Sequence, residues 1–143
     1  MSGELSSVRH AVYQNVHHVE WCTKYRFNVL GGRELLSACD ASIRRAAARH
    51  GIRVLELSVM PQHVHGIIEF PPSMSVSRAE GLLKGASARD MFTAFPHLRE
   101  RYWGGHFWSA GRFSRSVGDA DMNTVRHYVR SENDPHQTRL ATY

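Results

Sequence analysis

The spacing of apolar and polar residues changes along the chain and predicts a mixture of strands and helices. Short apolar runs that alternate with polar residues predict strands over residues 9–26, 52–60, 63–70 and 112–117. Apolar side chains three or four positions apart predict helices over residues 33–50, 77–94 and 120–132. Gly31 and Gly32 mark a turn before the first helix, and Pro71 and Pro72 end the third strand.

The order of these elements points to a fold class. Strand, helix, strand, strand, helix and strand follow one another, which is the β-α-β-β-α-β order of ferredoxin-like and RNA-recognition-type folds. In this α+β arrangement the helices cover one face of an antiparallel sheet and the other face is left open for a ligand. We predict one domain over residues 1–134 and a flexible C-terminal tail over residues 135–143, which begins at Pro135.

Two histidines lie on the third predicted strand. Side chains alternate along a strand, so His63 and His65 point to one face while Val64 points to the other. The apolar set should pack on the helices, which leaves the two histidines on the open face. Two imidazoles at positions i and i+2 of a rigid strand can chelate one metal ion. The alternative is a pair of half-buried polar residues with no ligand.

The last predicted helix carries a tyrosine and a carboxylate on one face. Met122, Val125 and Val129 form a buried stripe, and Tyr128 lies at its edge. Glu132 follows one turn later, and its carboxylate could join the two histidines as a third ligand for Mg²⁺ or Mn²⁺. The alternative for the tyrosine is a residue at the boundary of the core with its hydroxyl group in water.

Net charge adds a class of partner. The chain of 143 residues has a formal net charge of +5, and residues 24–53 and 78–115 have net charges of +5 and +4. Most of the basic residues are arginines, which pair with phosphate in a planar, bidentate way. Together with the aromatic residues, this pattern predicts nucleic-acid binding. An excess of arginine over lysine could also reflect genomic base composition, but that would not explain the net charge.

The same sequence excludes several other classes of protein. Two cysteines, Cys22 and Cys39, are too few for a disulfide framework and too far apart for a Cys-x-x-Cys metal site. No run of about 18 apolar residues is present, so we expect no membrane span. The first twenty residues lack the apolar stretch of a secretory signal. We therefore expect a cytoplasmic protein with no membrane partner.

Five ordered sequence blocks resemble the IS200/IS605-type single-tyrosine transposases, which belong to the His-hydrophobe-His superfamily of nucleases. The resemblance spans about residues 10–133. Its blocks are residues 21–26, 59–65, 83–87, 102–108 and 125–129. Five blocks in one order over a single domain are far more specific than any one of them.

The resemblance implies an activity and a division of roles. It implies that His63 and His65 bind a divalent metal, Mg²⁺ or Mn²⁺, with Glu132 as the third ligand and Tyr128 as the nucleophile. It implies cleavage and rejoining of single-stranded DNA at element ends that form imperfect hairpins, through a 5′-phosphotyrosine intermediate. It also implies a homodimer in which each active site takes its histidines from one subunit and its tyrosine helix from the other.

The positive blocks supply candidate phosphate contacts for this DNA. We predict DNA contacts from Lys24, Arg26, Arg78, Lys84 and Arg89. Three alternatives stay open: a non-catalytic single-stranded nucleic-acid-binding module, a metal-dependent phosphodiesterase that hydrolyses its substrate, and a domesticated relative that acts on repeated chromosomal hairpins.

Overall fold

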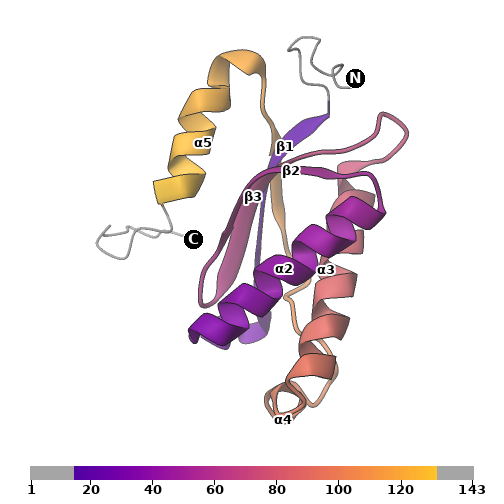
Figure 1. The fold of residues 1–143 in the computed structure, drawn as a ribbon, viewed down its shortest axis with the longest axis vertical. Helices are drawn as coiled ribbons and strands as arrows, with labels where there is room; N and C mark the ends of the chain where they lie inside the picture. The colour runs from indigo at the N-terminus through magenta and orange to yellow at the C-terminus, as the bar shows by residue number, and fades with distance from the viewer. Residues whose placement is uncertain (1–14, 132–143) are drawn as a thin grey trace.

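The computed structural model describes residues 15–131, which form a four-stranded antiparallel sheet flanked by helices (Figure 1). The strands are β1 (Val16–Cys22), β2 (Arg53–Val59), β3 (His63–Glu69) and β4 (Phe113–Ser116). They lie in the order β2-β3-β1-β4, and every pairing between neighbours is antiparallel. This topology confirms the predicted ferredoxin-like α+β fold and makes β1 and β3 its central strands.

Three longer helices and three short helical turns connect and flank the strands. The longer helices are α2 (Arg33–Arg49), α3 (Val76–Ala94) and α5 (Met122–Ser131). The short turns are η2 (Lys24–Arg26), α4 (Leu98–Arg101) and η3 (Asp119–Asp121). Helix α3 begins where the Ser75 hydroxyl accepts a hydrogen bond from the Arg78 backbone N–H at 3.0 Å. Just beyond the end of α2, Gly51 has a φ of +72°, which glycine adopts without strain.

Helices α2 and α3 pack on one face of the sheet and enclose the main hydrophobic core (Figure 1). Val64 and Ile68 of β3 point into this core, as the alternation predicted. Side chains that enclose the core include Val19, Trp21, Ile43, Leu83, Met91 and Phe107. Because strand side chains alternate, His63, His65 and Ile67 point to the other face of the sheet.

Helix α5 lies on that other face, which corrects the expectation that it would be open (Figure 1). Met122, Val125 and Val129 form a second buried cluster with Val16 and Ile67 of the sheet. The physical reason is the apolar stripe of α5, because three apolar side chains on one side of a helix need a surface to cover them. The sheet face is therefore partly covered by the helix that carries Tyr128.

Some predicted boundaries differ from the observed ones. The first strand ends at Cys22 rather than at residue 26, because Tyr25 has a φ of 64° and the chain turns there. The last helix begins at Met122, after the turn of η3. Residues 1–14, Glu132 and the predicted tail over 135–143 lie outside the described residues. Within the described part of the chain, no helix has the length and apolar character needed to cross a membrane.

Candidate active site

The pairing of β1 with β3 brings one carboxylate, three imidazoles and the Cys22 thiol to the same face of the sheet. Glu20 lies opposite His65, and Cys22 lies opposite His63. His18 precedes Glu20 by two positions on β1, so the two side chains share a face. The antiparallel register therefore sets one carboxylate beside imidazoles from two adjacent strands.

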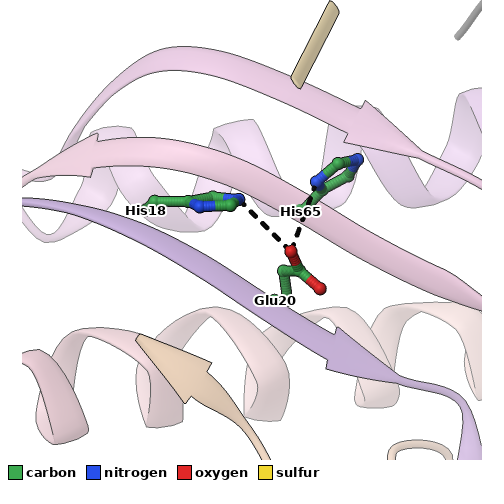
Figure 2. Close-up of side chains that lie close together, drawn as sticks. All are labelled: His18, Glu20 and His65. Atoms are coloured by element: carbon green, nitrogen blue, oxygen red, sulfur yellow. Dashed lines mark ion pairs between the residues drawn. The ribbon is translucent and has the colours of Figure 1, made fainter. Parts of the chain in front are cut away.

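Figure 2 shows the rings of His18 and His65 facing one carboxylate oxygen of Glu20. Glu20 Oε2 lies 3.4 Å from His18 Nε2 and 3.7 Å from His65 Nδ1. One donor atom of each residue lies within 4.8 Å of the others. The His65 side chain is fully buried and that of Glu20 is 13% exposed. The strands thus hold these three potential metal ligands in a largely buried group.

His63 lies beside this group, with its ring centroid 5.4 Å from that of His65. It also lines a cavity of about 180 Å³ together with Glu20, Arg112 and Phe113. The two histidines predicted as metal ligands are therefore neighbours on one sheet face, and Glu20 is close to both the cavity and the ring of His65.

Tyr128 projects from α5 over His65 and His18. Its ring meets the rings of His65 and His18 edge-on, at centroid distances of 5.4 and 5.7 Å. The side chain is 41% exposed and lines a cavity of about 370 Å³, to which Phe113 and Arg115 also contribute. A tyrosine hydroxyl in such a place can reach a substrate from solvent while its ring stays beside the imidazoles.

Packing holds α5 against the sheet, and two ion pairs lie along its side. Val129 is only 1% exposed within the second cluster. On the side towards β2, the Glu56 carboxylate pairs with Arg126 at 3.4 Å and with Arg130 at 2.7 Å. Because the residues at 126, 129 and 130 are anchored, the intervening Tyr128 is directed towards the histidines.

Burial keeps the His18 ring in the form that binds metals. Burial and, to a smaller extent, the nearby Arg115 guanidinium together lower the pKa of His18 to about 4. The imidazole is therefore neutral at pH 7 and its ring nitrogen can donate a lone pair. Two imidazoles and a carboxylate are a donor set that divalent metals accept, so the residues present fit a metal site.

The predicted site residues are only partly brought together. His63, His65 and Tyr128 meet on one sheet face, while Glu132 lies outside the described residues. Lys84 is half-buried and its ammonium donates a hydrogen bond to the Ser109 carbonyl at 3.0 Å.

The other predicted DNA contacts lie at two places, on α3 and on η2. Arg78 and Arg89 are exposed on α3, across the sheet from Tyr128. Lys24 and Arg26 lie on η2, where the Arg26 guanidinium donates to Cys22 Sγ at 2.7 Å. Lys24 also lines a small cavity that includes the exposed rings of Tyr25 and Trp103.

Sequence reasoning missed His18 and Glu20. Their i, i+2 spacing is the same signal that singled out His63 and His65, but the predicted strand over 9–26 was too long to fix their face. Their importance comes from the register that sets Glu20 opposite His65, and this register joins segments far apart in the sequence.

Comparison with known families gives a match over most of the chain. Residues 11–132 match the family model described as transposase IS200 like. The chain is 37% identical over 131 residues to the ISDra2 transposase TnpA of Deinococcus radiodurans, covering 92% of this chain and 93% of that protein. It is 31% identical over 130 residues to the transposase for insertion sequence element IS200 of Salmonella typhimurium, covering 91% and 84%.

Solved structures agree with these matches. The crystal structure of a Deinococcus radiodurans protein described as a transposase superimposes with a TM-score of 0.68 at 34% identity, covering 87% of this chain and 95% of that one. A REP-associated tyrosine transposase bound to a REP hairpin gives a TM-score of 0.63, covering 90% and 72%. That protein is only 14% identical, so its similarity concerns the fold alone.

Proposed function

Because the chain belongs to the family of IS200-like transposases, we propose that it cleaves and rejoins single-stranded DNA at element ends that fold into imperfect hairpins. The observation that supports this most directly is the position of Tyr128, whose ring lies against His65 at the edge of an open cavity. A tyrosine nucleophile beside imidazoles that can hold a metal ion suits phosphodiester transfer.

In the proposed reaction the Tyr128 hydroxyl oxygen attacks a DNA phosphorus atom in line with the leaving 3′-oxygen. The bond from phosphorus to the tyrosine oxygen forms, and the bond to the 3′-oxygen breaks. The tyrosine proton is released to solvent or to a neighbouring base, and the leaving oxygen ends as a 3′-hydroxyl group. A second 3′-hydroxyl then reverses these steps and joins a new strand, so the reaction consumes no nucleotide.

The resemblance suggests His63, His65 and Glu132 as ligands of Mg²⁺ or Mn²⁺ at this site. When bound, such an ion polarises the phosphoryl oxygens and stabilises the charge that develops on them. The buried imidazoles of His63 and His65 supply the ring nitrogens for it. Arg115 lines the same cavity as Tyr128 and can bind a phosphate of the DNA next to the reacting one.

We propose that the DNA is held mainly by basic side chains outside the catalytic group. Lys24, Arg26, Arg78 and Arg89 keep their proposed role as phosphate contacts. The cavity beside Lys24 also offers Trp103, which is 90% exposed and can stack on an unpaired base. Lys84 is half-buried and its ammonium already donates a hydrogen bond to the Ser109 carbonyl, so we expect it to contribute least.

We also propose a homodimer in which α5 of one subunit serves the histidines of the other. In the single chain, Tyr128 lies against its own His65, so sharing requires α5 to dock on the equivalent cluster of the partner. Mixing Tyr128→Phe with His65→Asn tests this. If subunits exchange freely and sites are shared, about a quarter of the wild-type sites are restored. If each chain uses its own tyrosine, the mixture is inactive.

The experiment that tests the activity uses labelled single-stranded hairpin DNA with Mg²⁺ or Mn²⁺. We expect a protein–DNA adduct that survives denaturation, that disappears with EDTA and that is absent in Tyr128→Phe. The matched control is Tyr25→Phe, which removes the hydroxyl of another exposed tyrosine and should leave the adduct unchanged.

The alternatives give different results in the same assay. A non-catalytic nucleic-acid-binding module retards the DNA without any adduct. A hydrolytic phosphodiesterase cleaves the DNA, forms no adduct and is unaffected by Tyr128→Phe. A domesticated relative gives the adduct, but its gene lacks the subterminal palindromes that flank an insertion sequence.

A further inference from the structure

We propose that Glu20 is a metal ligand and that His18, Glu20 and His65 form a divalent-metal site of two imidazoles and one carboxylate. Its ligands come from β1 and β3 alone, so it is complete without a residue after α5. The inference deepens the proposed function, because the ion would serve the same site, but binding of the ion can be measured without DNA.

The distances between the donor atoms support a shared ion. The separations of 3.4 and 3.7 Å between Glu20 Oε2 and the two ring nitrogens exceed the usual length of a hydrogen bond. Metal bonds of about 2.0–2.2 Å at tetrahedral or octahedral angles place neighbouring ligand atoms about 3.0–3.5 Å apart. The two separations that involve Glu20 are therefore within a few tenths of an ångström of the spacing of ligands on one ion, and all three donor atoms lie within 4.8 Å of one another.

The surroundings suit a metal ligand set on a rigid base. His18 and His65 are buried and lie on the two central strands of the sheet, with their ring centroids 5.7 Å apart. Backbone pairing of β1 with β3 fixes the backbone positions of all three residues, and burial restricts the rotamers of both rings before any ion arrives. The cavity under Tyr128 reaches His18 and Glu20, so an ion there keeps coordination positions that a phosphate oxygen can occupy.

The chemistry of the three ligands indicates the class of ion. Imidazole nitrogens prefer first-row transition ions, while carboxylate oxygens accept these as well as Mg²⁺. Two nitrogens and one oxygen therefore favour ions such as Mn²⁺ and Co²⁺ over Mg²⁺. The Irving–Williams order predicts that Co²⁺ binds more tightly than Mn²⁺ to the same ligands.

This ligand set shares only His65 with the set that the resemblance suggests. The two sets differ in their carboxylate, which is Glu20 in one and Glu132 in the other. A carboxylate substitution at each position therefore separates them, and a conservative change at Glu69 serves as a control. Glu69 is on β3, faces the same side of the sheet as His65 and pairs with Arg53.

The test is titration of the metal-free, full-length protein with Mn²⁺ and Co²⁺. Binding of both ions is measured by calorimetry, and binding of Co²⁺ also by its visible absorption. We expect Glu20→Gln to weaken binding of both ions by at least about tenfold, since even the loss of an outer partner of a ligand costs about that much. Glu20→Val, which suits a strand, serves as a second variant if the amide still coordinates. Glu69→Gln and Tyr128→Phe should bind as the wild type does, and Mg²⁺ should bind at least about tenfold more weakly than Mn²⁺.

The possible outcomes separate this inference from the proposed function. Unchanged binding in both Glu20 variants, or no binding of Mn²⁺ or Co²⁺ by the wild type, overturns the inference. Binding that depends on Glu132 but not on Glu20 does so as well. If the wild type binds metal through Glu20 but forms no DNA adduct, the site stands and the transposition chemistry is wrong. Circular dichroism of each variant shows that the fold is intact.

Discussion

A buried carboxylate on α3 leads to a quantitative prediction about pH and stability. Glu80 is fully buried and forms an ion pair with Arg112, which lines the cavity next to His63. Burial raises the pKa of the Glu80 carboxyl to about 7, although the charges of Arg112 and Lys84 oppose the rise. We predict that the free energy of unfolding of the wild type falls as the pH rises, and that the variant Glu80→Gln lacks this fall.

The sign and size follow from the two pKa values. The folded-state pKa of about 7 exceeds the ordinary value of 4.5, so the folded protein keeps a proton that the unfolded chain has lost between these pH values. The free energy of unfolding therefore falls as the pH rises through this range. At about 1.4 kcal/mol per pKa unit, the fall is about 3 kcal/mol between pH 4.5 and pH 7.

The assay is urea unfolding at several pH values from 4.5 to 8 in the presence of EDTA, and unfolding is monitored by tryptophan fluorescence. Trp21 and Trp108 are buried, so their emission reports the loss of the core. The wild type should lose about 3 kcal/mol relative to Glu80→Gln over this range. The control Glu100→Gln changes an exposed carboxylate of α4 and should follow the wild type. Parallel curves for the wild type and Glu80→Gln would refute the reasoning.

Two further predictions concern the supports of the site. Gly66→Ala should lower the free energy of unfolding by about 2 kcal/mol in urea titrations, because a Cβ at this position would lie 2.6 Å from the Glu56 carbonyl oxygen. Equal stability of that variant and the wild type would contradict this packing. Val129→Ala should cost about 2 kcal/mol by removing buried methyl groups under α5. It should also reduce the DNA adduct more than DNA binding, because it loosens the helix that carries Tyr128; equal losses would contradict this.

The fold and half of the site could be predicted because they depend on local patterns. Alternation along β3 is enough to put His63 and His65 on the face opposite Val64. The role of Glu20 depends instead on its register with His65, which the distant pairing of β1 with β3 decides. The prediction that the histidine-bearing face of the sheet would be open was wrong for a related reason. The stripe on the last helix indicated burial, but nothing local indicated which face of the sheet would receive it.

The two halves of the site rest on parts of the fold with different stability. The histidines and Glu20 lie on the central strands, which are paired on both edges and packed on both faces. Tyr128 lies on a helix of only ten residues, which is marginal on its own in water. Three buried apolar side chains of α5 contribute on the order of 5 kcal/mol to its docking.

Ion pairs between α5 and β2 add little to this docking, because Arg130 is largely exposed. We therefore expect docking of the tyrosine helix to be the least stable part of the site, while the strands keep the proposed metal ligands in place. In the dimer that we propose, α5 would leave the apolar surface of its own sheet and pack on the identical surface of the partner subunit. The apolar area that it buries would therefore change little. The tyrosine could then move with its bound DNA end while His18, Glu20, His63 and His65 stay fixed.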